Sequence, residues 1–351
     1  MTEPTRYWAQ DLVGLASGLL QDAGLGAEKA ATVAEVLVEG DLLGHDTHGL
    51  ALLGQYLDEL HAGRMARDGQ WSVHAAGGAV ETWDGRRLPG PWLVRHAAER
   101  AEALAAELGL GGVAIRRAGH IACLAAYLRP VAERGRMLVI ATSDPSTASV
   151  APFGGARRLT TPNPLAAGWP CPGGPVMIDV SMSVTTNGMT SRLRAEGAQF
   201  EHPWVMDADG APTRDPNAFF NNGTLLPLGG MEAGHKGFAL GLLVEALTSA
   251  LAGHGRADAD QQWGASVLVL AIDPARFGGL DGFVRETGWM AEQVHANPPI
   301  AGRPPPRLPG ERGLALRRRQ LAEGVSLHPS VAPALARRAA AAGIAMAPAA
   351  G

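Results

Sequence analysis

Apolar residues with helical spacing cover most of the first sixty positions. Leu12, Leu15 and Leu19 recur at intervals of three and four residues, and the run ends at Gly24, which is typical of a helix C-terminus. The same spacing continues in two further segments. The pattern therefore predicts a helical N-terminal unit, residues 1–68, with helices over 6–24 and 27–42, a short loop over 44–50, and a third helix that ends near residue 62.

Between residues 69 and 295 the pattern changes to short apolar strands that alternate with helices. Residues 71–73 and 79–83 alternate between apolar and polar positions and indicate a β-hairpin. Strands followed by helices are typical of an α/β fold. The predicted strands cover 112–116, 137–142, 165–169, 176–180 and 266–272. The predicted helices cover 92–108, 122–134, a segment that begins near Ser181, 235–251, and a segment that begins at Pro274 with Asp273 as its cap.

The last part of the chain, residues 296–351, opens with a proline-rich segment over 297–310. Two helices are predicted after it, over 312–323 and 329–342. We expect this C-terminal helical segment to pack back on the N-terminal unit. The α/β region over 69–295 is then the middle one of three parts.

Composition and charge exclude several classes of protein. The 351 residues carry 30 basic and 34 acidic side chains, a net charge of -4, and this balance does not favour a nucleic-acid partner. The first residues lack the basic start and apolar core of an export signal. The longest apolar helix, over 238–251, is too short to cross a membrane. Cys123 and Cys171 fit neither a disulfide framework nor a zinc site, so we expect a cytoplasmic protein without a membrane partner.

The loop Gly44-His45-Asp46-Thr47-His48-Gly49-Leu50 concentrates the candidate chemistry. His48 can exchange a proton near neutral pH, Thr47 can hydrogen-bond a substrate oxygen, and Asp46 can hold an imidazole in one tautomer. The alternative is that Asp46 or Thr47 only caps the next helix and that both histidines are polar surface residues. The residues of the loop alone do not decide between these interpretations.

This loop resembles the Gly-x-Asp-Ser/Thr-His-Gly signature of the malate/L-lactate dehydrogenase family of nicotinamide enzymes. Further motifs follow in the order of that family, and the resemblance covers nearly the whole chain. It implies an α/β, non-Rossmann nicotinamide-binding fold with a mixed sheet, which agrees with the absence of a Gly-x-Gly-x-x-Gly loop. The motifs are Gly119-His120, Asn163-Pro164-Leu165-Ala166, Asp179 to Ser183, Pro212-Thr213-x-Asp215-Pro216, Gly229-Gly230, Lys236-Gly237 and Pro309-Gly310-Glu311.

The resemblance also implies roles for individual residues. His48 is the first candidate to donate or accept the proton during hydride transfer and His120 the second, with Thr47 beside them and Asp179 as the carboxylate that orients His48 or carries charge in the pocket. The implied cofactor is NAD or NADP. Backbone amides at the start of the helix near Ser181 can bind phosphate, and Lys236 can pair with it. The candidate cofactor residues are Ser143, Asp144, Asp179, Ser181, Ser183, His235, Lys236, Gly237, Gly310 and Glu311.

Several positions depart from the family pattern and concern the substrate. Many members have an arginine where this chain has Leu52, and an arginine can bind a carboxylate with two hydrogen bonds. Met189 stands where members have a lysine, and Ala122 and Cys123 stand where a glycine and an arginine are common. Either Arg117 supplies the missing cation, or the substrate is larger or less charged than a small 2-hydroxy acid.

The sequence therefore predicts an NAD(P)H-dependent oxidoreductase that acts on a 2-oxo acid, a 2-hydroxy acid or a related cyclic imine. A family member without redox activity, which serves as a binding or scaffold subunit, is the alternative. Zinc bound by histidines is a further hypothesis, but the loop has no cysteine or His-x-x-x-His pattern, so we expect no metal. The resemblance also implies a homodimer. The four histidines considered for zinc are His45, His48, His120 and His235.

Overall fold

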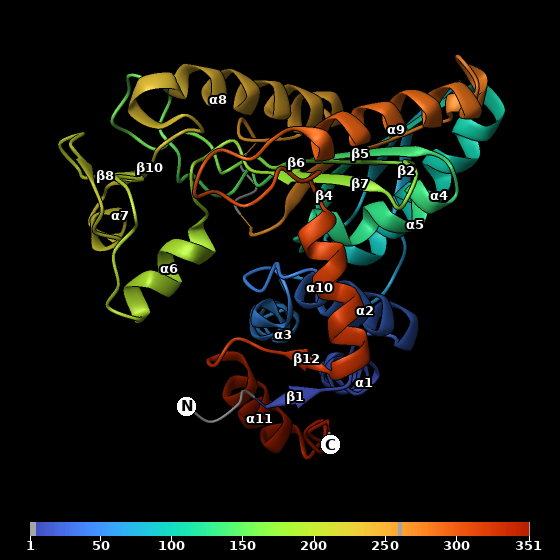
Figure 1. Cartoon of the computed structure of the whole chain (residues 1–351). Coiled ribbons are helices and arrows are strands. Elements are labelled where there is room, and N and C mark those ends of the chain that lie inside the picture. The colour runs from blue at the N-terminus through green and yellow to red at the C-terminus, as the bar shows by residue number, and fades with distance from the viewer. Residues whose placement is uncertain (1–4, 259–261, 351) are drawn as a thin grey trace.

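A seven-stranded sheet runs through the upper part of the molecule (Figure 1) in this computed structural model, which describes residues 5–258 and 262–350. The strand order is β2-β3-β4-β11-β5-β6-β7. β3 and β4 are parallel, and the other neighbours are antiparallel. The expected α/β class with a mixed sheet is confirmed. The bounds are β2 (Ser72–Gly77), β3 (Val80–Asp84), β4 (Leu110–Ala118), β5 (Met137–Ser143), β6 (Leu165–Trp169), β7 (Val176–Val180) and β11 (Ala265–Ile272).

Helices cover both faces of this sheet, and the central strand β11 shows how. Val267 and Val269 belong to the main core together with residues of α4 (Gly90–Leu108). Leu268 packs instead in a second cluster with Val244 of α8 (Gly230–Glu245), which continues as a π-helical turn over Ala246–Ala250. Because successive side chains of a strand point to opposite faces, β11 is buried on both sides. Its sequence therefore reads as a continuous apolar run.

Gly111 lets α4 lie close against β4. A Cβ atom at this position would overlap the backbone carbonyl oxygen of Ala101 in α4. Any larger residue would separate the helix from the strand, and the apolar contacts between them would be lost. α4 ends at Gly109, whose φ of 88° is left-handed, so the chain can reverse directly into the strand.

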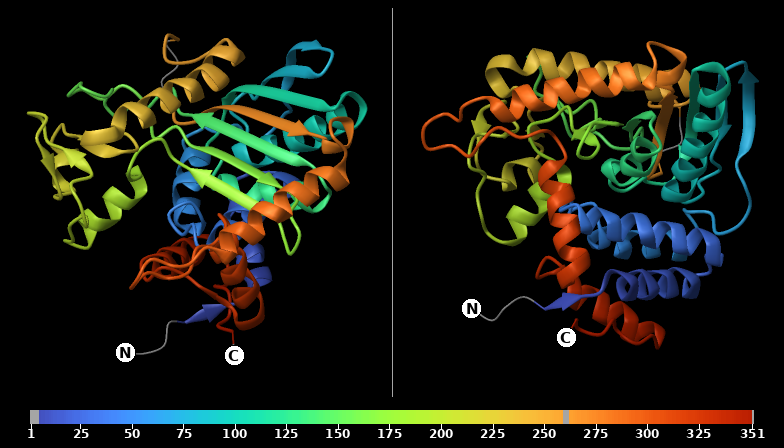
Figure 2. Two further views of the ribbon diagram at one scale, coloured as in Figure 1. Left: turned by 45° about the horizontal axis from the view of Figure 1, so that its top comes forward. Right: turned by 45° about the vertical axis from the view of Figure 1, so that its right-hand side comes forward.

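The two ends of the chain meet in the lower part of the molecule (Figures 1 and 2). β1 pairs antiparallel with β12, α10 contacts α2, and α11 contacts α1 and α3. These contacts place the C-terminal helices on the N-terminal ones, whereas the division of the chain into three domains stays a prediction. The elements are β1 (Arg6–Tyr7), α1 (Ala9–Asp22), α2 (Ala27–Leu42), η1 (Leu50–Leu52), α3 (Leu53–His61), α10 (Glu311–Glu323), β12 (Val325–Ser326) and α11 (Val331–Ala342).

A small arm with its own core stands beside the main sheet (Figure 1). It holds a three-stranded sheet in the order β10-β8-β9, and its core is a cluster that contains Phe200, Val205 and Phe219. The arm lies between β7 and α8 in the sequence. Its elements are α6 (Asn187–Ala195), β8 (Val205–Met206), β9 (Pro212–Thr213), α7 (Asn217–Phe220) and β10 (Thr224–Leu225).

The prediction of a helix that begins near Ser181 is wrong. Ser181 donates a hydrogen bond to the carbonyl of Ser183, and Ser183 donates one to the carbonyl of Thr185. These side-chain hydrogen bonds compete with a helix, and the chain stays extended to Thr186. α6 begins only at Asn187, where the Thr186 hydroxyl accepts the backbone N–H of Met189 as an N-cap.

Other helices also differ from the prediction. The segment predicted as one helix over 122–134 is a 3-10 turn, Leu124–Tyr127, followed by α5, Leu128–Glu133. α8 begins at Gly230, five residues before the predicted start, so Lys236 lies inside the helix. The helix predicted to begin at Pro274 is a 3-10 turn, Pro274–Arg276, for which the Asp273 side chain is the N-cap. α9 (Leu280–Ala296) follows it, and Gly288 and Ala291 are its buried residues. Among the described helices, none has the length and apolar content needed to span a membrane.

We predict that Gly111→Ala lowers the free energy of unfolding by about 2 kcal/mol or more, because the added methyl group overlaps the α4 backbone and cannot be relieved by a side-chain rotation. Urea denaturation measures this value. Gly77→Ala is the matched control, since a Cβ at Gly77 meets nothing within 4 Å. Equal stabilities of the two variants would contradict the close approach of α4 to β4.

Candidate active site

A cavity of about 560 Å³ opens between the loop after α2, the turn after β4 and the ends of β5 and β7. This volume is within the usual range of small-molecule sites. The lining residues come from segments that are far apart in the sequence. Those predicted from the sequence as site residues are Thr47, His48, His120, Ser143, Asp144, Asp179 and Ser181.

A buried acid, Asp41, holds the loop that carries His48. Asp41, at the end of α2, is 4% exposed, and its carboxylate accepts the backbone N–H of Leu50 at 2.8 Å. Gly49 lies directly against this carboxyl group, so a Cβ there would overlap it. Burial raises the pKa of Asp41 to about 7, although the hydrogen bond from Leu50 opposes this shift. Asp41 therefore determines the course of the loop on which His48 sits.

Thr47 and His48 act as a pair. The Thr47 hydroxyl lies 2.9 Å from Nδ1 of His48, so one ring nitrogen is fixed and Nε2 is left for the cavity. Burial lowers the pKa of His48, and the negative charge of Asp179 acts in the opposite direction. When His48 is protonated, its Nδ1–H donates to Thr47, and the Thr47 O–H is then available to a ligand.

His120 is held in a more rigid and more apolar setting. Its ring stacks on Trp263 with centroids 4.7 Å apart, and its Nδ1 accepts the backbone N–H of Ala122 at 3.1 Å. The neutral ring therefore carries its hydrogen on Nε2. Burial, together with the neighbouring His48, lowers the pKa of His120 to about 3. His120 is thus neutral at physiological pH. It can donate a hydrogen bond, but it does not carry the additional proton that a general acid must give up.

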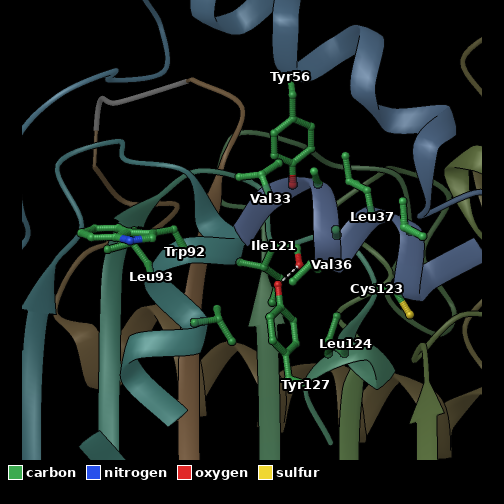
Figure 3. Packing of buried hydrophobic residues seen from close by; sticks show 14 of the residues in the cluster. Val33, Val36, Leu37, Tyr56, Trp92, Leu93, Ile121, Cys123, Leu124 and Tyr127 are labelled. Atoms are coloured by element: carbon green, nitrogen blue, oxygen red, sulfur yellow. Dashed lines mark hydrogen bonds between the residues drawn. The ribbon is translucent and has the colours of Figure 1, made fainter. Parts of the chain in front are cut away.

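Two buried tyrosines, Tyr56 and Tyr127, which are labelled in Figure 3, fix the backbone around His120. Tyr56 of α3 donates its O–H to the carbonyl of His120, and Tyr127 donates to the carbonyl of Ile121. Both tyrosines are less than 9% exposed. The N-terminal helices and the sheet therefore meet at this turn, which explains how a residue at the end of β4 comes to face the loop of His48.

Asp179 is the penultimate residue of β7 and lines the same cavity. Its Oδ2 accepts the backbone N–H of Ala125 at 2.9 Å and lies 3.9 Å from the sulfur of Cys123. Its influence on His48 is electrostatic, since its charge raises the pKa of that imidazole. The cavity thus contains the imidazoles of His48 and His120 and the carboxylate of Asp179.

Comparison with known proteins agrees with this arrangement. The sequence matches the family model described as malate/L-lactate dehydrogenase over residues 8–336. The chain belongs to this family. The family expected from the sequence, and the enzyme class of a dehydrogenase, are therefore confirmed.

Similar proteins include dehydrogenases and reductases. The chain is 32% identical to a (2R)-3-sulfolactate dehydrogenase (NADP(+)) of Chromohalobacter salexigens, over 87% of this chain and 89% of that protein. It is 31% identical to a Delta(1)-pyrroline-2-carboxylate reductase of Ancylobacter novellus, over 93% and 95%. The solved structure of malate dehydrogenase from Pyrococcus horikoshii superposes with a TM-score of 0.89 at 26% identity and covers 99% of this chain and 98% of that one.

Besides Asp179, three of the residues implied as cofactor contacts line the cavity. Ser143 donates to or accepts from the hydroxyls of Thr248 and Ser249 in the π-helical turn after α8. Asp144 folds over its own loop and accepts hydrogen bonds from Ser146 and Thr147. Ser181 is held by the Ser183 carbonyl. Their side chains already have hydrogen-bond partners within the protein, so this part of the cavity surface is ordered before a ligand binds.

The other implied cofactor residues lie outside this cavity lining. His235 and Lys236 are exposed on α8, and Gly237 packs so closely on Leu228 that a Cβ would overlap its backbone. Ser183 is buried and bonded to Thr185. Gly310 packs on Met177 of β7, and Glu311 accepts the backbone N–H of Leu308 and pairs with His295 at 2.6 Å. In the protein alone, Ser183, Gly237, Gly310 and Glu311 therefore have structural contacts.

Arg117 is not brought into the cavity. Its guanidinium is bound by the buried carboxylate of Asp84, and the positive φ of 53° at Arg117 turns the chain there. A paired cation is not presented to a substrate, so the predicted substrate contact is not formed here. Among the described lining residues there is no lysine or arginine.

Sequence reasoning missed several residues of the site. Asn187 lines the cavity, and its Oδ1 is buried without a hydrogen-bond partner among the described residues. Gln55 and Trp263 also line it. The only sequence signal for Asp41 was an acid that ends an apolar helix just before the loop. No local pattern identifies the others, because each reaches the cavity through tertiary packing.

We predict that Asp41→Asn changes the pH dependence of stability. The native pKa of Asp41, about 7, lies above the unfolded value near 3.9. The native state therefore binds the proton more tightly, and this contribution to stability is lost as pH rises from about 4 to about 7. The free energy of unfolding of the wild type, minus that of the variant, should fall by about 2 kcal/mol between pH 5 and pH 8. A difference that is constant with pH in urea titrations would contradict the raised pKa.

Proposed function

We propose that this protein is an NAD(P)H-dependent oxidoreductase that transfers a hydride to or from a 2-oxo acid, a 2-hydroxy acid or a related cyclic imine. The observation that carries this proposal is the convergence of His48, Thr47 and Asp179 on one cavity with the neutral His120. Relatives named as sulfolactate dehydrogenase and pyrroline-2-carboxylate reductase support this range of substrates.

We assign proton exchange to His48. Reduction of a carbonyl or imine builds negative charge on the acceptor atom, and a proton must reach that atom. Burial lowers the pKa of His48, but the charge of Asp179 opposes this shift. The pKa of His120, about 3, leaves no proton to give at neutral pH. His120 instead donates a hydrogen bond from Nε2 and orients the substrate. Thr47 holds the His48 ring and, with His48 protonated, can donate to the same acceptor atom.

The cavity can hold the nicotinamide end of the cofactor, which when bound supplies or accepts the hydride. The unpaired Oδ1 of Asn187 fits an amide N–H donor such as a carboxamide group. We propose that Ser143, Asp144, Asp179 and Ser181 border the bound cofactor. The implied cofactor residues that lie outside the cavity remain candidates to bind the part of the cofactor distant from the nicotinamide, and only the resemblance supports them. They are Ser183, His235, Lys236, Gly237, Gly310 and Glu311.

The composition of the cavity wall bears on the substrate. Because the described lining has no lysine or arginine, an acid group of the substrate would be bound by neutral donors. The amides of Gln55 and Asn187 and the hydroxyl of Ser191 line the cavity and can serve in this way. Leu52 contributes an apolar surface where many family members have an arginine. This wall favours a substrate with an apolar portion over a small dianion.

We predict that His48→Ala lowers turnover by about a hundredfold or more, the usual contribution of a positioned general acid, while the affinity for reduced nicotinamide is nearly unchanged. Affinity is measured from tryptophan fluorescence, because Trp263 stacks on His120 in the cavity. Trp263→Phe should remove most of the quenching and serves as its control. Thr47→Val should lower turnover less than His48→Ala does.

Two results would change this assignment. Full turnover in His48→Ala together with loss of turnover in His120→Ala would move proton exchange to His120. Nucleotide binding without turnover on any oxo acid, hydroxy acid or cyclic imine would favour the alternative, a binding or scaffold subunit without redox activity. Comparison of NADH with NADPH in the same titration identifies the preferred cofactor.

We also propose that the protein is a homodimer and that α8 lies in the contact. The residues of α8 that are buried against the sheet are Gly234, Gly237, Gly241 and Val244, whereas its large apolar residues face outwards. Large apolar side chains that expose about half of their surface are unusual on a helix without a partner. They are Met231, Leu240, Leu242 and Leu243, with Leu251 after the helix. Participation of the N-terminal helices in the contact is part of the same proposal.

We predict that Leu243→Glu converts the dimer to a monomer, because a charge in an apolar contact loses its hydration without gaining a partner. Light scattering at micromolar concentration measures the molar mass. Leu108→Glu, on an equally exposed leucine at the end of α4, is the matched control and should leave the mass unchanged. A wild-type monomer, or a dimer that persists in Leu243→Glu, would contradict the role of α8.

We further propose a cytoplasmic protein whose partners are small molecules, without nucleic acid or membrane. Cys123 and Cys171 are both free, which suits a reducing compartment. The near balance of 30 basic and 34 acidic residues supports the absence of a nucleic-acid partner.

A further inference from the structure

We propose that His45, Cys123 and Asp179 form a binding site for a zinc ion, and that zinc bound there inhibits the enzyme. One imidazole nitrogen, the thiol sulfur and one carboxylate oxygen lie within 4.8 Å of one another. The three residues come from the loop after α2, the turn before the 3-10 helix Leu124–Tyr127 and the end of β7. All three line the cavity of the active site. The inhibitory part of this proposal depends on the proposed function, whereas the binding part does not.

The chemistry of the three groups favours zinc over the alkaline-earth ions. Sulfur and imidazole nitrogen are ligands of zinc and copper, while Mg²⁺ and Ca²⁺ prefer oxygen. Three protein ligands with one position left open are the pattern of an accessible zinc site. The open position would face the cavity, where water or an acid group of a ligand can occupy it.

The residues around the three groups support a pre-formed site. Asp179 Oδ2 already accepts the Ala125 N–H at 2.9 Å and lies 3.9 Å from the Cys123 sulfur, so the carboxylate has a fixed orientation. Ligand atoms around tetrahedral zinc lie roughly 3.3 to 3.8 Å apart, given bonds of about 2.0 to 2.3 Å. Side-chain rotation of His45, which is only partly buried, can close the remaining distance.

Binding must displace a proton from Cys123. Burial and the nearby charge of Asp179 raise the pKa of this thiol well above its usual value, so the thiol is neutral without metal. Zinc binds the thiolate, and one proton is therefore released for each ion bound. Affinity should rise with pH for this reason.

Zinc at this position would disturb the proton exchange assigned to His48. Asp179 and His48 line the same cavity, so a divalent cation bound to Asp179 would add positive charge near the imidazole. The ion would also occupy part of the cavity where the substrate binds, so turnover should decrease.

The test measures binding of Zn²⁺ and Co²⁺ to the full-length protein without cofactor or substrate. We expect one equivalent of zinc to bind with proton release, and the cobalt form to show thiolate-to-metal charge-transfer absorption in the near ultraviolet. Cys123→Ser and His45→Gln should each weaken zinc binding by at least about tenfold. Cys171→Ser and His61→Gln are the matched controls, and both should bind zinc as the wild type does.

Each outcome decides the proposal. Unchanged binding in Cys123→Ser, or a cobalt spectrum without the thiolate band, would show that surface histidines bind the metal and would overturn the site. If Cys123→Ser does not fold, the cobalt spectrum of the wild type still tests whether a thiolate binds the metal. Saturable binding without loss of turnover would overturn the inhibitory part. The metal titrations do not depend on turnover. They therefore test the metal site even if the protein lacks the proposed oxidoreductase activity, and the two proposals can fail separately.

Discussion

The buried carboxyl group of Asp41 is the constraint on which the geometry of the active site depends. It accepts the N–H of Leu50, and the absence of a side chain at Gly49 allows the loop to close over it. The end of α2 is also held from the far end of the chain, because Gln320 of α10 donates to the carbonyls of Asp41 and Leu42. A buried acid that is costly to ionise thus links the N-terminal helices, the C-terminal helices and the loop of His48.

The mixed sheet explains how residues from separate parts of the sequence reach this loop. β5 and β7 end at the cavity and deliver Ser143 and Asp179, and the turn after β4 delivers His120. These positions depend on strand pairing over long distances in the sequence, with β11 between β4 and β5. The tyrosines Tyr56 and Tyr127 then lock the turn at His120 against the N-terminal helices (Figure 3).

Two histidines with similar sequence signals receive different chemical properties from their surroundings. Burial, together with the neighbouring His48, lowers the pKa of His120 and keeps it neutral. His48 is also desolvated, but it feels the charge of Asp179. Charge is sparse elsewhere on the wall, because Arg117 is held by Asp84 outside the cavity. The low dielectric of such a site strengthens the electrostatic interactions of the few charges that line it.

The sequence by itself determined the elements whose signals are local. The strands β6 and β7 occupy the predicted residues, and the loop of His48 lies between two helices, because apolar periodicity and glycine positions act over a few residues. Only the tertiary structure decided the rest. Ser181 hydrogen-bonds locally instead of starting a helix, Arg117 is captured by Asp84, and Asp41, Asn187 and Trp263 join the site through contacts between distant segments. Partners of this kind are chosen by packing, and packing has no signature in a short stretch of sequence.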